Sequence, residues 1–159
     1  DWQVPNLPRR FHAGPNRPTV ELLGRFAGDF AFEAILRPET PPESSLVDYG
    51  VVYRAQDPGN YYAFLIGADG YYAVLKVEAG RGTFLSPWRQ FPHVGRGLES
   101  NRLLIACAQT ECSFRVNDEY VLTVDDDQWL SGEFGVAARS PEGEVIVTLL
   151  RARLWLGGR

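Results

Sequence analysis

Five polar or aromatic side chains in the middle of the sequence could together hold a polar ligand: Arg54, Gln56, Tyr61, Tyr72 and Lys76. Their guanidinium, amide and ammonium groups donate hydrogen bonds, and tyrosine rings stack on the apolar face of a ligand. A small anionic or polyhydroxyl ligand could bridge the two cations. The alternative is that these cations lie over the sheet surface and pair with carboxylates such as that of Glu78.

Two further residues are candidates for the same ligand site. Trp88 follows Pro87 near an expected loop, and an exposed indole offers a broad apolar plane on which a sugar ring can stack. A buried core tryptophan is the competing interpretation. Arg139 ends a run in which Phe134, Val136 and Ala138 alternate as inward-facing residues, so its own side chain should lie on the other face.

The sequence offers little for catalysis. A retaining glycosidase needs two carboxyl groups roughly 5 Å apart. The only Asp/Glu pairs two positions apart are Asp125 with Asp127 and Glu142 with Glu144, and both lie in expected turns. We therefore expect no catalytic residues, and a glycoside hydrolase-like enzyme is only the third functional hypothesis.

Metal ligands are also sparse. His12 and His93 are the only histidines, and both lie in loops rich in proline or glycine. The run Asp125-Asp126-Asp127 could supply oxygen ligands to calcium, although a solvated acidic turn is the favoured interpretation. We expect no metal site and no cofactor, with calcium as the open alternative.

The two cysteines, Cys107 and Cys112, flank a predicted hairpin turn at Gln109-Thr110. In that register they form the non-hydrogen-bonded pair next to the turn, where Cβ atoms come closest. A disulfide fits this geometry, against the alternative of two buried thiols. A disulfide points to an extracytoplasmic or secreted protein.

Short apolar runs separated by turn signals predict an all-β protein, because no helical periodicity persists over ten residues. Residues 1–19, with four prolines, predict an irregular N-terminal arm, and residues 20–159 a single β-sandwich domain. A surface loop is expected from Pro38 to Ser45. The expected strands are Val20–Arg25, Asp29–Arg37, Tyr49–Gln56, Tyr61–Gly67, Tyr71–Val77, Thr83–Trp88, Asn101–Ala108, Glu111–Val116, Tyr120–Val124, Gly132–Arg139 and Glu144–Leu156.

Two turns predict the register of the three central strands. Asp69-Gly70, as a two-residue hairpin turn, would place Ile66 opposite Ala73. The turn at residues 57–60 would place Val51 opposite Ile66. Both registers assign the same residues to an outer face: Val52, Arg54, Gln56, Tyr61, Ala63, Leu65, Tyr72, Val74, Lys76 and Glu78.

Composition narrows the possible partners. With 159 residues, a net charge of −4 and its arginines scattered singly, the chain lacks the basic stripe that nucleic-acid binding requires. No apolar run is long enough to predict a membrane span. The sequence contains no methionine, so we expect a processed product or a segment of a larger protein.

Several short motifs resemble those of concanavalin A-like jelly rolls, in particular the laminin-G and 3-keto-disaccharide-hydrolase-like group. The resemblance covers residues 28–156, and the motifs are Gly28-Asp29-Phe30, Tyr49-Gly50-Val51-Val52-Tyr53-Arg54, Asn60-Tyr61-Tyr62-Ala63-Phe64, Asp69-Gly70-Tyr71-Tyr72, Asn101-Arg102-Leu103, Phe114-Arg115-Val116-Asn117-Asp118 and Gly132-Glu133-Phe134-Gly135-Val136. The resemblance implies an antiparallel two-sheet β-sandwich whose concave sheet often carries a carbohydrate site.

These observations lead to one functional hypothesis and one alternative. The first is a non-catalytic extracytoplasmic module that binds carbohydrate, or a related polar ligand, on the concave face. The alternative is a structural or protein-interaction module of a larger surface protein. Under the first hypothesis the ligand-binding residues are Arg54, Gln56, Tyr61, Tyr72, Lys76, Trp88 and Arg139.

Overall fold

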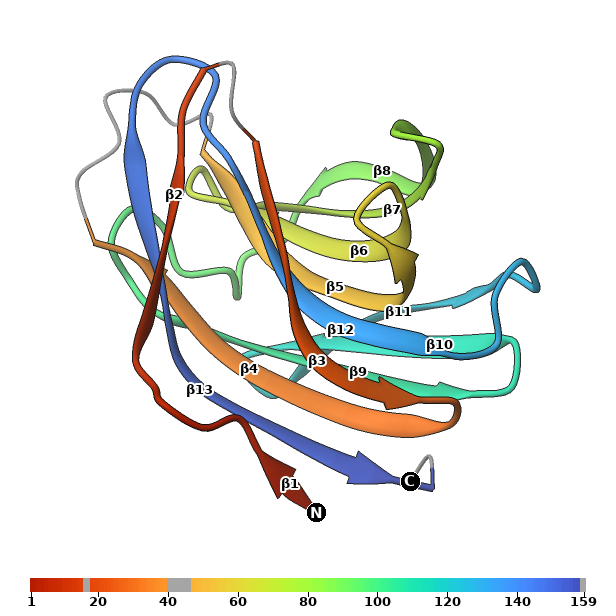
Figure 1. Ribbon diagram of the computed structural model, residues 1–159. Helices are drawn as coiled ribbons and strands as arrows, with labels where there is room; N and C mark the ends of the chain where they lie inside the picture. Colours follow the sequence, from red (N-terminus) through yellow and green to blue (C-terminus); the bar gives the residue numbers. More distant parts are fainter. Residues whose placement is uncertain (16–17, 40–46, 158–159) are drawn as a thin grey trace.

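The protein is a sandwich of two antiparallel β-sheets in a computed structural model that describes residues 1–15, 18–39 and 47–157 (Figure 1). The six-stranded sheet has the order β3-β12-β5-β6-β7-β8. Its strands are β3 (Thr19–Ala27), β5 (Asp48–Asp57), β6 (Asn60–Gly67), β7 (Tyr71–Glu78), β8 (Arg81–Gln90) and β12 (Gly132–Arg139). The all-β sandwich predicted from the sequence is confirmed.

The seven-stranded sheet follows the path β1-β13-β4-β9-β10-β11, with β2 also paired to β13. Its strands are β1 (Trp2–Gln3), β2 (Arg9–Ala13), β4 (Phe30–Pro38), β9 (Asn101–Ala108), β10 (Glu111–Val116), β11 (Glu119–Asp125) and β13 (Val145–Leu156). Residues 1–19, for which the sequence predicts an irregular arm, thus contain two short strands on the edge of this sheet. Most of the predicted loop after Pro38 lies outside the described residues.

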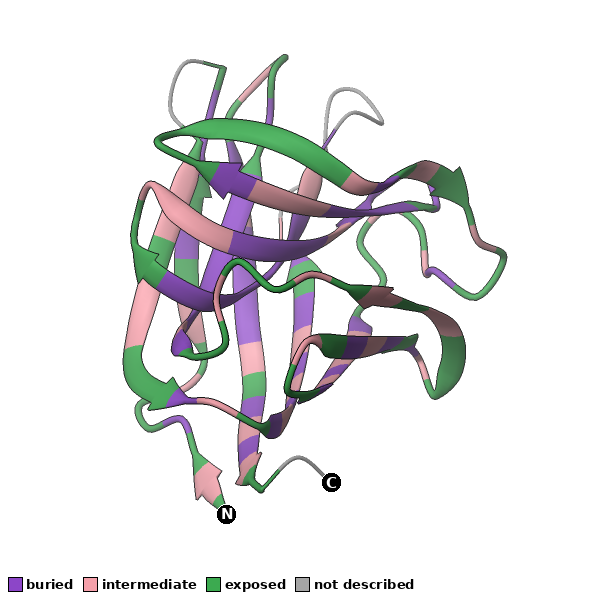
Figure 2. Ribbon diagram, turned by 90° about the vertical axis from the view of Figure 1, so that its right-hand side faces the viewer, coloured by how far each residue is buried: buried purple, intermediate pink, exposed green. Residues whose placement is uncertain are grey.

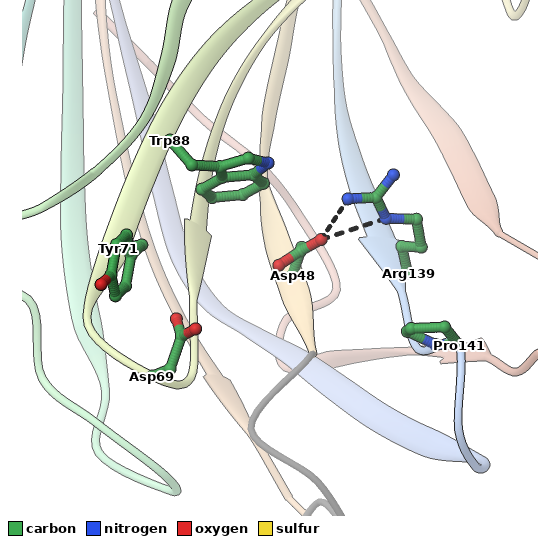
Figure 3. Close-up of a pocket in the computed structure, with 6 residues that line it drawn as sticks. All are labelled: Asp48, Asp69, Tyr71, Trp88, Arg139 and Pro141. Carbon is green, nitrogen blue, oxygen red and sulfur yellow. Dashed lines mark hydrogen bonds and ion pairs between the residues drawn. The ribbon is translucent and has the colours of Figure 1, made fainter.

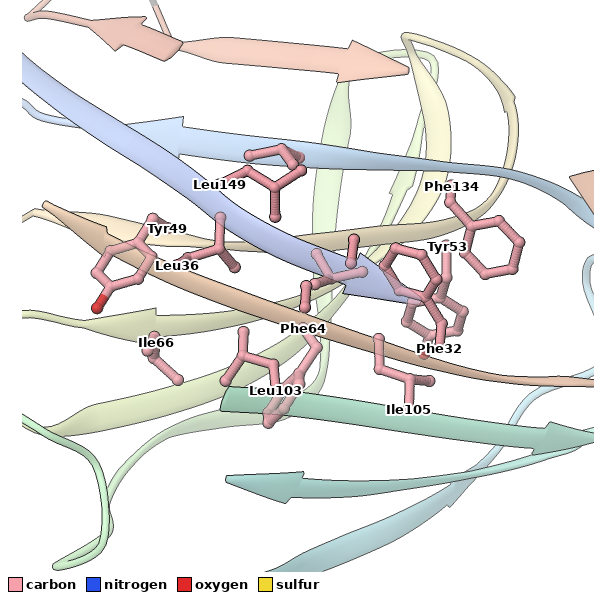
Figure 4. Close-up of a cluster of buried hydrophobic side chains, with 14 of the residues drawn as sticks. Phe32, Leu36, Tyr49, Tyr53, Phe64, Ile66, Leu103, Ile105, Phe134 and Leu149 are labelled. Atoms are coloured by element: carbon pink, nitrogen blue, oxygen red, sulfur yellow. The ribbon is translucent and has the colours of Figure 1, made fainter. Parts of the chain in front are cut away.

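The core fills the space between the two sheets (Figure 4). Phe32 of β4 stacks on Phe134 of β12 with their ring centroids 4.6 Å apart, which joins the two layers. Burial is deepest along the central strands, whereas β8 and β11 are largely exposed (Figure 2). Because β8 and β11 are edge strands, each has a neighbouring strand on one side only.

The register between β9 and β10 agrees with the sequence prediction. Cys112 lies directly opposite Cys107, and the two form a disulfide with their Cα atoms 4.1 Å apart. Gln109 adopts a positive φ of 54° in the two-residue turn between them. The predicted disulfide is therefore confirmed.

The predicted register between β6 and β7 is wrong by one residue. Ile66 lies opposite Tyr72 instead of Ala73. The loop contains three residues instead of two, because the Gly70 amide donates to the Gly67 carbonyl (3.0 Å) and Gly70 takes a φ of +93°. A shift of one residue moves each β7 side chain to the opposite face, so Tyr72 and Val74 pack in the core.

The register between β5 and β6 also differs from the prediction. Asp57 pairs with Asn60 as expected, but an irregularity between Tyr53 and Asp57 places Val51 opposite Phe64 instead of Ile66. Arg54 lies in this bulge with a φ of +50°. Gly132 of β12 fits against the bulge because a Cβ there would lie 2.4 Å from the Arg54 carbonyl carbon. The bulge turns the Arg54 side chain toward the core side of the sheet.

Candidate functional site

A cavity of about 490 Å³ lies at the end of the six-stranded sheet, across strands that are distant in the sequence (Figure 3). We call it the rim pocket. It is lined by Asp48, Asp69, Tyr71, Trp88, Arg139 and Pro141. The cavity therefore combines two aromatic rings, two carboxylates and one guanidinium.

Asp48 and Arg139 form the central ion pair of the rim pocket. They lie directly opposite each other on β5 and β12. Both Nε (3.0 Å) and Nη2 (2.5 Å) of Arg139 donate to Oδ2 of Asp48 (Figure 3). Among the described residues, Oδ1 of Asp48 and Nη1 of Arg139 have no hydrogen-bond partner. The Arg139 side chain is 53% exposed, so a ligand in the cavity can reach its guanidinium.

The electrostatics of the pocket are set by burial and by a second carboxylate. Burial raises the pKa of the Asp48 carboxyl; the Arg139 guanidinium opposes this rise and the charge of Asp69 adds to it. Asp69 reaches this position because residue 67 is a glycine: a Cβ there would lie 2.4 Å from Oδ1 of Asp69. Because two carboxylates and one guanidinium line the pocket, its net charge is negative and disfavours an anionic ligand.

Trp88 enters the pocket from a bulge in β8. Arg89 pairs with Tyr72 and Ser86 with Val74, so Pro87 and Trp88 together lie opposite one residue of β7. Proline has no amide hydrogen for the ladder, and bulges reorient side chains. The half-buried Trp88 indole is thereby brought to the same cavity as Tyr71 and the ion pair (Figure 3).

A second cavity, of about 250 Å³, continues from the rim pocket, because Asp48 and Arg139 line both. We call it the outer groove. It lies on the face of the sheet that carries a small cluster of Val52, Ala55 and Ala137, separate from the main core. The lining residues are Pro18, Thr19, Val20, Asp48, Tyr61, Ala63, Leu65, Leu75, Val77, Gly80, Gly82, Ala137, Ala138 and Arg139. Of the residues that the sequence predicts to bind a ligand, Tyr61 and Arg139 line this groove.

Arg54 lies elsewhere, in the interior at the end of the sandwich. Its side chain is 1% exposed and its guanidinium lies over the Phe30 ring, 5.9 Å from the centroid. Nη2 donates to the Gly28 carbonyl (3.0 Å) and Nη1 to the Trp129 carbonyl (3.4 Å). The expected outer-face position of Arg54 is therefore wrong, because the bulge in β5 turns the side chain inward.

Lys76 also differs from its expected position, because the register of β7 is shifted. Its Nζ donates to Oδ2 of Asp126 (3.0 Å), and the Tyr62 hydroxyl donates to Oδ1 of the same carboxylate. Burial raises the pKa of Asp126, but the hydrogen bonds from Tyr62, the Gln128 amide and Lys76 together hold it below its usual value. Arg54, Tyr62, Lys76 and Asp126 are called the interior polar cluster below.

The remaining predicted residues lie outside both cavities. Tyr72 is buried and packs edge-on against Phe91, with the ring centroids 5.9 Å apart. The Gln56 amide donates to the backbone carbonyls of Arg54 (3.2 Å) and Ser131 (2.7 Å). The structure thus places Trp88 with Arg139 in the rim pocket and Tyr61 with Arg139 in the outer groove. Neither cavity contains Arg54, Gln56, Tyr72 or Lys76.

Four residues that line the rim pocket are absent from the sequence-based candidates: Asp48, Asp69, Tyr71 and Pro141. The two-residue turn that puts Tyr72 on the outer face puts its neighbour Tyr71 in the core, and the sequence indicates Asp69 only as a turn residue. Asp48 and Arg139 become neighbours only through the pairing of β5 with β12, which sequence-local patterns do not report. Within residues 1–15, 18–39 and 47–157, no group of three or more His, Cys, Asp or Glu side chains could hold a metal ion. The same residues include no helix able to span a bilayer.

The fold is shared with many solved structures. No protein-family model and no curated protein matches the chain. The carbohydrate-binding module CBM66 from Bacillus subtilis aligns with a TM-score of 0.69 at 15% identity, over 86% of this chain and 82% of that one. The galectin LEC-6 of Caenorhabditis elegans aligns with a TM-score of 0.60 at 12% identity, over 92% of this chain and 95% of that one.

A variant of the GH43 protein BlXynB from Bacillus licheniformis also matches, with a TM-score of 0.65 at 12% identity, over 94% of this chain and 33% of that one. At these identities the similarity defines the fold alone. The chain has the jelly-roll fold of the concanavalin A-like lectins and glucanases, as the sequence motifs predicted.

Proposed function

We propose that the protein is a non-catalytic carbohydrate-binding module whose ligand occupies the rim pocket. The observation that carries the proposal is the combination of an indole, a phenol ring and a partly open ion pair around one cavity of about 490 Å³. Ligand sites typically combine apolar walls with a few convergent polar groups. The rim pocket has both.

The chemistry of the pocket suits a sugar. A pyranose ring has an apolar face that can stack on Trp88 or Tyr71, and hydroxyl groups at its edge that both donate and accept. Nη1 of Arg139 can donate to such a hydroxyl, and Oδ1 of Asp48 can accept from one. Asp69 adds a second acceptor. Because the carboxylates outnumber the guanidinium, we expect neutral or amino sugars to bind better than acidic ones.

Two other findings support this proposal. Solved structures with the same fold include a protein named as a carbohydrate-binding module and several galectins. The Cys107–Cys112 disulfide is typical of proteins outside the cytoplasm. We accordingly propose an extracytoplasmic location, and the disulfide itself is expected to form only under oxidising conditions.

A glycan-array screen followed by fluorescence titration tests the proposal. Trp88→Ala should weaken binding of any glycan hit by about 30-fold or more, because it removes the largest apolar contact of the pocket. Trp155→Ala is the matched control: Trp155 is half-buried on β13 of the other sheet, under the Arg153 guanidinium. It should leave the affinity unchanged.

Two results would overturn the proposal. One is an absence of hits across neutral, amino and acidic glycans, which would favour a protein-interaction module. The other is a glycan hit whose affinity is the same in the Trp88→Ala and wild-type proteins, which would place the binding site elsewhere on the sandwich.

A further inference from the structure

The outer groove has an apolar floor on a face where antiparallel sheets are usually polar. Its floor residues come from three strands: Ala63 and Leu65 of β6, Leu75 and Val77 of β7, and Ala137 of β12. A sheet with one face on the core normally alternates apolar and polar side chains. Here both faces are apolar along β6 and β7. Ala63, Val77 and Ala137 are buried at the bottom of the groove, and Leu65 and Leu75 are partly exposed in it. An apolar cavity of this kind is typical of a ligand-binding groove.

The outer groove and the rim pocket can be occupied by one ligand. Both cavities are lined by Asp48 and Arg139, so this ion pair marks their boundary. From there the groove crosses β6 and β7 toward the start of β8. At that far end, a Cβ on Gly82 would lie 3.2 Å from Cδ2 of Leu75. A side chain at position 82 would therefore narrow the groove.

The two cavities differ in the ligand groups that they favour. Beyond the ion pair, the floor side chains are aliphatic, and hydroxyl groups placed over them would lose hydrogen bonds to water without replacement. An apolar chain placed there would instead gain the free energy of leaving water. The rim pocket, with its excess of carboxylate, disfavours a phosphate or another anionic head group.

We propose that the ligand is an amphipathic glycoside, with its sugar in the rim pocket and an apolar aglycone along the outer groove. This inference rests on the proposed carbohydrate-binding function, and it adds an apolar aglycone to the sugar that the proposed function requires. The sugar supplies orientation through Trp88, Asp48 and Arg139, and the aglycone supplies affinity by burial on Leu65 and Leu75.

Alkyl glycosides of increasing chain length test the inference directly. Methyl, hexyl and octyl β-glucosides and β-galactosides are titrated below their micelle concentrations, with calorimetry and tryptophan fluorescence as readouts. Affinity should rise by up to about fourfold for each methylene that enters the groove. Equal affinities of the methyl and octyl glycosides would overturn the inference, and so would an absence of binding by every alkyl glycoside.

Two groove variants localise the effect. Leu65→Thr keeps a residue suited to a strand but makes the floor polar, so it should reduce the gain from methyl to octyl while leaving methyl-glycoside binding unchanged. Gly82→Val should have the same effect by narrowing the far end. Leu98→Thr, at an exposed loop leucine outside the groove, is the control and should change neither affinity. A chain-length gain that persists in both groove variants would overturn the inference.

The same titrations separate this inference from the proposed function. If chain length matters but the sugar and Trp88 do not, the groove binds apolar chains and the proposed sugar site is wrong. If the methyl and octyl glycosides bind equally and Trp88→Ala abolishes both, the sugar site is correct and the inferred aglycone site is wrong.

Discussion

The rim pocket and the interior polar cluster contain similar groups in opposite environments. Each has a guanidinium, an aspartate and at least one aromatic ring. In the rim pocket the Arg139 side chain is 53% exposed. Its Nη1 has no hydrogen-bond partner among the described residues. In the interior cluster Arg54 is 1% exposed and its two terminal nitrogens donate to backbone carbonyls. Its Nε has no partner among the described residues, but it is buried where a ligand cannot reach it.

This difference separates a binding role from a structural one. A buried guanidinium whose terminal nitrogens donate inside the protein stabilises the fold and is out of reach of a ligand. Arg139 instead lies half-exposed beside a mostly buried Asp48, so its guanidinium can be reached by a ligand in the pocket. Residue type alone does not distinguish the two roles, whereas burial and partners do.

Arg54→Ala should have the largest effect on stability. The substitution leaves the Gly28 and Trp129 carbonyls without their donor and removes a large buried side chain, so the free energy of unfolding should fall by about 3 kcal/mol. Urea denaturation measures this loss. Arg102→Ala, at an exposed arginine paired with Glu33 and Asp118, should cost less than about 1 kcal/mol. Equal losses in the two variants would contradict the structural role of Arg54.

The disulfide should have the next largest effect. Cys107 lies opposite Phe30, whose ring is beneath the Arg54 guanidinium. Both cysteines belong to the seven-stranded sheet, whereas the rim pocket lies at the end of the six-stranded sheet. Replacing both cysteines by alanine should lower the free energy of unfolding by about 2 kcal/mol on the chain-entropy model for so short a loop. Glycan affinity of the folded protein should not change. A loss of affinity at full folding would show that the two regions are coupled.

Asp126→Asn should have the smallest effect, and its size should depend on pH. The folded pKa of Asp126 lies below the ordinary 3.8, so its carboxylate stabilises the fold above that pH and the contribution is lost as the pH falls through the folded pKa. We expect the variant to be less stable by about 1 kcal/mol at neutral pH. The difference should shrink in acid, as measured by urea midpoints at pH 7 and below pH 3.8. A difference that grows in acid would contradict this assignment.

The fold was predictable from the sequence because alternation and turn signals recur along the whole chain. The register of β9 and β10 followed from one two-residue turn. The register of β6 and β7 did not, because Asp69-Gly70 suits loops of two or three residues equally and only the packed sheet chooses between them. That one-residue shift exchanged Tyr71 and Tyr72 between the faces.

The site was harder to predict for two physical reasons. The bulge at Arg54 has no local signal, since arginine rarely takes a positive φ. The pair of Asp48 with Arg139 depends on contact between strands that are 91 residues apart in the sequence. Trp88 and Arg139 were chosen from local patterns, and their position in one cavity is a property of the folded sheets.

The most direct test of this account compares Arg139→Ala with Lys76→Ala in the same glycan titration and the same urea denaturation. Arg139→Ala should weaken glycan binding at least about tenfold. Because it leaves the mostly buried Asp48 without its partner, it should also lower the free energy of unfolding by about 1 kcal/mol. Lys76→Ala should keep the wild-type affinity and lose about 1 kcal/mol of stability. Loss of binding in Lys76→Ala, with binding retained in Arg139→Ala, would contradict the assignment of the ligand site to the rim pocket.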